Sequence, residues 1–268
     1  MNFDAEVKTP KKIHYIWLGG SEKPALVRQC IESWKRYCPD FEIIEWDDKK
    51  FAKICDNNYA LEAYAKKKWA FAADWLRLKV LYEQGGFYLD TDVEVLQPID
   101  EFLHNELTMS TELISDRLAL NTAFIGCSAK NVFIGEFLHL YDSIPFVLKN
   151  GEYDLTPNTA RLKMFLEEKR NLKLPKWDET MCIGPGMFIY PATWFQMSST
   201  GYALHHFSAS WLEGWKRKIC FSFGRYKLVR FKRRLEVDSI SPELHSGEEV
   251  VFSLKLGCRK RILLIKQI

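Results

Sequence analysis

Residues 85–92 restrict the fold of this 268-residue chain more than any other segment, because they join the end of a helix to a buried strand. The preceding residues 61–83 carry apolar side chains at helical spacing, and Gly85 suits the cap that ends a helix. Three apolar residues then predict a short strand, which ends in Asp90 and Asp92. A long helix that leads into a short buried strand is typical of α/β proteins.

The N-terminal part of the chain predicts the same architecture. Residues 12–20 read as a buried strand that ends in a glycine turn, residues 24–37 as a helix, and residues 41–46 as a second strand. Strand, helix and strand in this order open many nucleotide-binding folds. We therefore expect an α/β domain.

The composition excludes several other classes of protein. No run of about 18 apolar residues predicts a membrane-spanning helix, and the N-terminus lacks the basic and apolar regions of a secretory leader. The seven cysteines are scattered, and none form a Cys-x-x-Cys pair, so neither a zinc site nor a disulfide framework is indicated. We expect free thiols and a cytoplasmic location.

The charge is distributed unevenly along the chain. The net charge is +3, yet residues 211–268 hold 14 Lys or Arg against 6 Asp or Glu. Nine basic residues and no acidic ones stand between positions 216 and 234, interleaved with apolar residues. The sequence therefore predicts a main domain over residues 1–215 and a basic amphipathic C-terminal segment over residues 216–268.

This C-terminal segment has three interpretations. A basic amphipathic stretch binds membrane surfaces that contain anionic lipids, and it would then act as a peripheral membrane anchor. It also fits the solvated face of an ordinary helix, and it fits nucleic acid, whose phosphates and bases attract basic and aromatic residues. We favour the membrane surface and place nucleic acid last, so no nucleic-acid partner is expected.

Asp90 and Asp92 are the first candidates for chemistry. Residues two apart on a strand point to the same face, so both carboxylates can hold one hard divalent cation. Such a cation neutralises the charge that builds on a diphosphate leaving group. Taken alone, a short Asp-x-Asp pattern favours a solvated turn.

Asp74 and Arg77 add to these carboxylates. They stand three apart on the helix that precedes the strand, and so they share a helix face. One interpretation is a surface ion pair of little energetic value. The other is that they bind sugar hydroxyls or a diphosphate, for which the fixed fork of an arginine is well suited.

Four segments in a fixed order carry a resemblance to a known family. They are residues 10–17 (Pro-Lys-Lys-Ile-His-Tyr-Ile-Trp), residues 73–77 followed by a Leu-Tyr pair, residues 85–92, and residues 205–211 (His-His-Phe-Ser-Ala-Ser-Trp). Together they resemble glycosyltransferase family GT32, which includes yeast-type initiating mannosyltransferases and bacterial capsular-sugar transferases. They are also similar to the glucosyltransferase domains of clostridial toxins. Nothing after about residue 215 shares the resemblance.

The resemblance implies a GT-A fold, which is a single Rossmann-like nucleotide-sugar-binding domain with a central mixed sheet. It further implies a nucleotide-sugar donor, Mn²⁺ or Mg²⁺ as cofactor, and transfer with retention of the anomeric configuration. Catalysis would rest on Asp74, Arg77, Asp90 and Asp92.

The resemblance also assigns individual roles. Asp90 and Asp92 would hold the metal together with His206, and His205 is the second choice. Only one of the two histidines should reach the metal, because adjacent residues on one strand point in opposite directions. His14 has the simpler interpretation of a hydrogen-bonded core residue. The donor would be bound by Trp17 stacked on its base, by Asp74, Arg77, Asp90 and Asn121 near its ribose and sugar, and by Trp211 on the departing phosphate.

From these observations we predict a retaining, metal-dependent hexosyltransferase. It would move a hexose or N-acetylhexosamine from a nucleotide sugar, preferably a UDP-sugar, to a saccharide or lipid-linked saccharide acceptor in bacterial surface polysaccharide synthesis. The first alternative is a GDP-mannose-dependent mannosyltransferase. A metal-dependent phosphoryl-transfer enzyme and an inactive carbohydrate-binding or membrane-binding protein are further alternatives.

Overall fold

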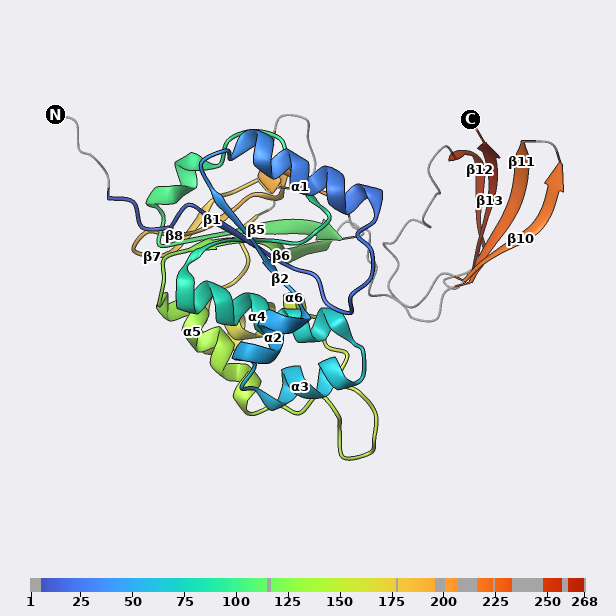
Figure 1. Cartoon of the computed structure of the whole chain (residues 1–268). Helices are drawn as coiled ribbons and strands as arrows, with labels where there is room; N and C mark the ends of the chain where they lie inside the picture. The colour runs from blue at the N-terminus through green and yellow to red at the C-terminus, as the bar shows by residue number, and fades with distance from the viewer. Residues whose placement is uncertain are drawn as a thin grey trace. The chain divides into compact units, whose positions relative to one another are not determined.

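The computed structural model describes residues 6–114, 117–176, 178–195, 201–206, 216–223, 225–232, 248–256 and 260–267 (Figure 1). The chain separates into two compact units, Met1–His206 and Phe207–Ile268. The expected boundary at residue 215 falls among residues 207–215, which lie outside the described part of the chain, and it stays a prediction.

The first unit is built on one mixed sheet of seven strands in the order β2-β1-β3-β6-β5-β8-β7. β1 is parallel to both β2 and β3, and β5 is parallel to β8, whereas β6 runs antiparallel to β3 and β5. The strands are β1 (Lys12–Ile16), β2 (Glu42–Trp46), β3 (Gly86–Leu89), β5 (Leu107–Ile114), β6 (Arg117–Cys127), β7 (Met181–Gly184) and β8 (Met187–Tyr190). The predicted α/β class with a central mixed sheet is confirmed.

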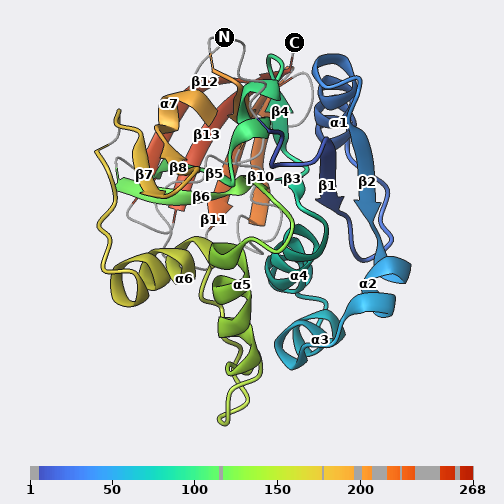
Figure 2. The same cartoon turned by 90° about the vertical axis from the view of Figure 1, so that its left-hand side faces the viewer.

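Helices cover both faces of this sheet (Figures 1 and 2). On one side lies α1 (Ala25–Tyr37), and on the other lie α2 (Asp48–Ile54), α3 (Asn58–Ala65), α4 (Trp69–Gln84) and α5 (Val132–His139). Shorter elements are α6 (Asn158–Met164), α7 (Ala192–Phe195), the 3₁₀ turns η1 (Asp100–His104) and η2 (Leu140–Asp142), and the π turn η3 (Phe165–Lys169). None of the described helices is both long and apolar enough to cross a membrane.

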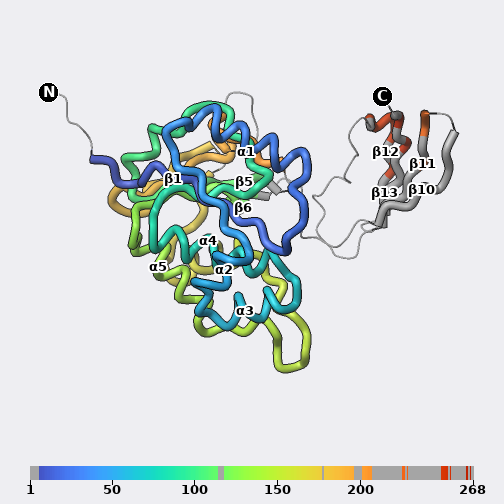
Figure 3. The backbone as a smooth tube through the Cα atoms, in the orientation of Figure 1, coloured from blue at the N-terminus to red at the C-terminus, as the bar shows by residue number. Residues whose placement is uncertain are grey.

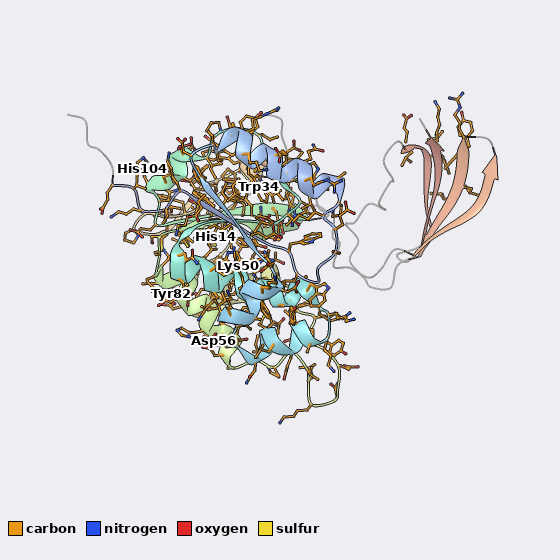
Figure 4. All side chains as sticks on the ribbon, viewed as in Figure 1. His14, Trp34, Lys50, Asp56, Tyr82 and His104 are labelled. Carbon is orange, nitrogen blue, oxygen red and sulfur yellow. The ribbon has the colours of Figure 1, made fainter. Side chains whose placement is uncertain are left out.

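Alternation along the central strands divides the core in two. Ile13 and Phe87 belong to the cluster beneath α1, whereas Ile16 and Tyr88 belong to the cluster beneath α4 and α5. His14 of β1 and Trp34 of α1 lie on opposite sides of the sheet (Figure 4). Residues 13–16 and 86–89 are therefore buried on both faces of the sheet, which explains why neither segment alternates between apolar and charged residues.

His14 has the core role that the sequence favoured. It is fully buried, its Nε2 bonds to the Gly85 carbonyl at 2.9 Å, and Trp46 donates its indole N–H to Nδ1 at 3.1 Å. Burial lowers the pKa of His14 to about 4. The ring is therefore a neutral link between β1, β2 and the end of α4.

The single helix expected over residues 61–83 is wrong in one respect, because the chain breaks it between α3 and α4. Lys67 has a positive φ of 57°, and the Lys67 and Lys68 amides bond back to the last turn of α3. After α4 the chain turns at Gly85, where an added Cβ would lie 2.6 Å from the amide nitrogen of Ala129. The close approach explains the glycine at this position.

The second unit is an antiparallel sheet of four strands in the order β10-β11-β13-β12. The strands are β10 (Lys216–Phe223), β11 (Tyr226–Lys232), β12 (Glu248–Leu256) and β13 (Lys260–Gln267), drawn as arrows in Figure 1, whereas Figure 3 traces the backbone of the first unit. The interpretation of residues 216–234 as a helix face is wrong, since the described residues of this segment form β10 and β11.

Candidate active site

The candidate site lies where the chain leaves β3. The Asp90 amide donates to the Ala123 carbonyl at 2.8 Å, and the Val93 amide donates to the Asp90 carbonyl at 3.0 Å. Asp90 and Asp92 therefore lie in a tight turn between β3 and β4 (Val93–Val95), and not on a strand end as expected. The turn, and not strand alternation, brings the two carboxylates together.

A distant segment completes this cluster. β9 (Ala203–His205) pairs antiparallel with β4, and the register places His205 opposite Val93. One carboxylate oxygen of Asp90, one of Asp92 and one ring nitrogen of His205 lie within 4.8 Å of one another. Two carboxylates and an imidazole form a donor set that suits a divalent cation such as Mn²⁺.

The two neighbouring histidines separate in the structure. His205 Nε2 lies 3.5 Å from Asp92 Oδ1, whereas His206 Nε2 lies 2.9 Å from Glu94 Oε2. The backbone amide of His206 donates to the Asp92 carbonyl at 3.0 Å. The structure thus brings the second choice, His205, to the aspartates and turns the first choice, His206, toward Glu94. Metal binding by either ring stays a prediction.

Glu112 is a buried carboxylate that the sequence analysis missed. It lies on β5, and its Oε2 is 3.5 Å from His205 Nδ1. Burial alone would lower the pKa of His205, but the neighbouring carboxylates of Asp92 and Glu112 outweigh burial and raise the pKa to about 10. A metal ion that binds this ring must therefore displace a proton.

Arg77 is buried among the acidic residues. Its guanidinium contacts Asp74 Oδ1 at 2.9 Å and Asp90 Oδ1 at 3.3 Å, and it donates to the Thr122 carbonyl at 2.7 Å. The guanidinium also stacks 4.6 Å from the ring centre of Tyr88, whose O–H donates to Asp90 Oδ1 at 2.7 Å. Arg77 and Tyr88 together fix the position of the Asp90 carboxylate.

The burial of Asp74 and Arg77 follows from the place of α4. This helix packs on β1 and β3 and is covered by α3 and α5, so it is buried on nearly every side. Burial raises the pKa of Asp74 to about 7, although Arg77 opposes that shift. The backbone of Asn158, at the start of α6, bonds to the same carboxylate. The interpretation of Asp74 and Arg77 as a surface pair is therefore wrong.

Trp17 lies at the same edge of the sheet. β1 and β3 run parallel with His14 opposite Tyr88, so the residues after Ile16 and after Leu89 leave the sheet at one edge. Trp17 is half-buried, and its indole N–H donates to the Ser21 carbonyl at 2.7 Å. Ligands of open α/β sheets bind at the carboxyl ends of parallel strands, which is where Trp17 and Asp90 both stand.

The remaining predicted residues have different outcomes. Asn121 is fully buried on β6, where its Oδ1 accepts from the Ala123 amide at 2.7 Å, and the Ala123 carbonyl in turn holds the Asp90 amide. Asn121 is thus two hydrogen bonds away from Asp90. Trp211 lies outside the described residues.

Comparison with known proteins gives one family match. Residues 24–111 match the model of the family described as "glycosyltransferase sugar-binding region containing DXD motif". This segment includes four of the predicted residues, namely Asp74, Arg77, Asp90 and Asp92.

Three curated relatives share part of the chain. An uncharacterized glycosyltransferase of Acanthamoeba polyphaga mimivirus is 33% identical over 35% of this chain and 39% of its own length. The initiation-specific alpha-1,6-mannosyltransferase of Candida albicans is 24% identical over 47% of this chain and 34% of its own. The subversion of eukaryotic traffic protein A of Legionella pneumophila is 26% identical over 37% of this chain and 19% of its own length. The chain thus spans less than two fifths of the length of each of these relatives.

Two solved structures are distantly similar. The PaToxG glycosyltransferase has a TM-score of 0.43 and 21% identity, over 60% of this chain and 70% of its own. A glycosyltransferase involved in the glycosylation of the major capsid of PBCV-1 has a TM-score of 0.45 and 13% identity, over 75% and 95%. At these TM-scores the likeness carries no functional conclusion.

Proposed function

Residues 24–111 belong to the sugar-binding region of the DXD glycosyltransferases, and from this premise we propose that the chain transfers a sugar from a nucleotide-sugar donor to a saccharide acceptor. The observation that carries the proposal is the cluster of Asp90, Asp92 and His205 at the edge of the sheet. Its two carboxylates come from residues 24–111, which we call the family segment, and its imidazole comes from β9.

The cluster fits the divalent cation that such a transfer uses. Asp90, Asp92 and His205 would hold the ion, which when bound neutralises the charge of the diphosphate leaving group. Arg77 and Tyr88 keep the Asp90 carboxylate in place before any ligand arrives, and such preorganisation lowers the cost of reaching the charged transition state. Mn²⁺ or Mg²⁺ is the proposed cofactor.

The donor is proposed to be a uridine sugar. Trp17 leaves the sheet at the edge that holds Asp90, and its half-buried indole offers a face on which a base can stack. Asp74, buried beside Arg77, is proposed to bind the hydroxyls of the ribose or of the sugar. GDP-mannose is the alternative donor, and the names of the mannosyltransferase relatives support it.

The proposal extends to retention of the anomeric configuration, by attack from the side of the leaving group. It also extends to bacterial surface polysaccharide as the product. Both rest on the resemblance to the capsular-sugar transferases alone. The cysteines are scattered, and five of them are free thiols, which supports a cytoplasmic location; the five are Cys30, Cys38, Cys55, Cys127 and Cys182.

An anionic membrane surface is the proposed partner of the second unit. Antiparallel partners share a sheet face, so Phe252, Leu264 and Leu228 stand side by side across β12, β13 and β11. Phe252 is 55% exposed, and Leu254, two residues along the same face, is 44% exposed. Residues 216–268 also carry a large excess of Lys and Arg. Exposed apolar side chains within a basic sheet match the apolar interior and anionic headgroups of a lipid surface.

The transferase proposal is tested by a donor panel. Purified protein is mixed with Mn²⁺ and with UDP-sugars or GDP-mannose, and the thermal midpoint and donor hydrolysis are measured. We expect one donor to raise the midpoint and to be hydrolysed slowly, and Asp92→Asn to abolish both effects. Asp40→Asn is the matched control, because this carboxylate is exposed and lies at the α1–β2 turn. If no donor stabilises the protein, the transferase proposal is wrong.

A further inference from the structure

Glu112 is a buried carboxylate that faces one side of the His205 ring, and Asp92 faces the other side. Glu112 is only 3% exposed, and the other residues of β5 are all uncharged. A carboxylate at such a position is costly to bury unless a charged or hydrogen-bonding partner compensates for the lost water. The charged partner beside it is His205, whose Nδ1 lies 3.5 Å from Glu112 Oε2, which is the distance of an ion pair and not of a hydrogen bond.

The ring of His205 lies between two carboxylates. Nε2 faces Asp92 Oδ1 at 3.5 Å and Nδ1 faces Glu112 Oε2 at the same distance. An imidazole that binds a metal through Nε2 carries its proton on Nδ1. A carboxylate that accepts this proton selects the tautomer, fixes the ring plane and makes Nε2 a better ligand.

We propose that Glu112 is a positioning residue, which holds the ring of His205 so that Nε2 is directed at the metal site of Asp90 and Asp92. This inference rests on the proposed function, since it assumes that the cluster binds a divalent ion. The inference goes beyond the proposed function because it assigns a role to Glu112, which lies outside residues 24–111 and on β5, a strand to which none of the three proposed ligands belongs.

The neighbouring histidine provides a matched control. Glu94 lies 2.9 Å from His206 Nε2, so each of the two adjacent histidines has its own glutamate. Glu112→Gln and Glu94→Gln make the same chemical change beside successive residues of the chain. If His205 is the ligand, only the first change should weaken metal binding; if His206 is the ligand, only the second should.

The experiment measures Mn²⁺ affinity without donor, from the electron paramagnetic resonance signal of the free ion. We expect Glu112→Gln to weaken Mn²⁺ binding about 10- to 100-fold, which is the usual effect of removing a partner of a metal-bound histidine. Glu94→Gln should bind within about twofold of the wild type. Circular dichroism shows that each variant is folded at the assay temperature.

Two further variants separate positioning from a general structural effect. In a His205→Ala background, Glu112→Gln should cause no additional loss of Mn²⁺ affinity, whereas a structural role would weaken binding in both backgrounds. Glu112→Asp keeps the charge and shortens the side chain, so it replaces Glu112→Gln in the experiment if that variant does not fold. We expect Glu112→Asp to weaken Mn²⁺ binding by a smaller factor than Glu112→Gln.

The outcomes distinguish this inference from the proposed function. Normal Mn²⁺ binding by the wild type together with unchanged binding by both Glu112 variants would overturn the role of Glu112 alone. Loss of affinity in Glu94→Gln but not in Glu112→Gln would overturn it in favour of His206. A wild type that binds no Mn²⁺ would overturn the metal site itself, and the role of Glu112 with it.

Discussion

The buried guanidinium of Arg77 forms an ion pair with the partly exposed carboxylate of Asp90, with Nη1 3.3 Å from Oδ1, and so links α4 to the turn after β3. The same guanidinium contacts Asp74 and the Thr122 carbonyl, so it serves two carboxylates and one backbone acceptor. Arg77 therefore holds both carboxylates in place in the structure itself.

Replacement of Arg77 should therefore destabilise the fold. Arg77→Met leaves the buried carboxylate of Asp74 and the partly exposed carboxylate of Asp90 without their cation, and we expect a loss of about 3–5 kcal/mol in the free energy of unfolding, mainly from Asp74. Urea denaturation measures this loss. Lys35→Met, which breaks an exposed pair with Glu32, should change it by less than about 1 kcal/mol. Equal midpoints for Arg77→Met and the wild type would contradict the buried network.

The hydroxyl of Tyr88 should matter for the metal as well as for stability. Tyr88→Phe removes the donor that holds Asp90 Oδ1, and we expect about tenfold weaker Mn²⁺ binding. Tyr64→Phe is the matched control, because its O–H donates at the same 2.7 Å to Asp48 Oδ1, and Asp48 is not a member of the cluster of Asp90, Asp92 and His205. Titration calorimetry of both variants decides the matter, and similar affinities in the two would show that Tyr88 has no part in the site.

His14 predicts a specific loss of stability in acid. Its pKa is about 6.5 when the chain is unfolded and about 4 in the folded protein, so the folded state resists protonation. Its contribution is fully present above pH 6.5 and falls as the pH drops toward 4, by about 3 kcal/mol in total. Unfolding free energies of the wild type and His14→Gln should converge over this range. A difference between the two proteins that does not change with pH would refute the assignment.

The exposed face of the second unit predicts binding to anionic vesicles. Leu254→Asp places a negative charge among the exposed apolar residues, and we expect roughly tenfold weaker cosedimentation with phosphatidylcholine–phosphatidylglycerol vesicles. Leu61→Asp changes an equally exposed leucine of α3 and should have no effect. Wild-type binding should also weaken with salt. If the wild type ignores anionic vesicles, the membrane proposal is wrong.

The sequence predicted those parts of the fold that depend on local patterns. β1, α1, β2 and β3 were all expected, because buried strands and an amphipathic helix have distinct apolar periods. The break between α3 and α4 was missed, since three consecutive lysines and one left-handed residue interrupt a pattern that otherwise continues. The strands of the second unit were missed as well, because basic and apolar residues are interleaved there without a regular period.

The candidate site was only partly predictable, for a related reason. Asp90, Asp92, Asp74 and Arg77 stand close in the chain and were found together. The choice between His205 and His206 depends on the register of β9 against β4, which no local pattern determines. Glu112 did leave a signal, as the one charged residue in the described part of β5, and an isolated acid in a buried strand indicates a specific partner.

The pairing of β4 with β9 also has a consequence for biosynthesis. Glu94 and His206, which bond across this pairing, are separated by 112 positions in the chain. A protein is synthesised from its N-terminus at about 5–20 residues per second, so the two aspartates leave the ribosome several seconds or more before the histidines. During that interval the nascent chain carries Asp90 and Asp92 without the imidazole that completes their cluster. The metal site proposed for Asp90, Asp92 and His205 would therefore be complete only when residue 205 has emerged and β9 has paired with β4, and metal binding would then be one of the last events in folding.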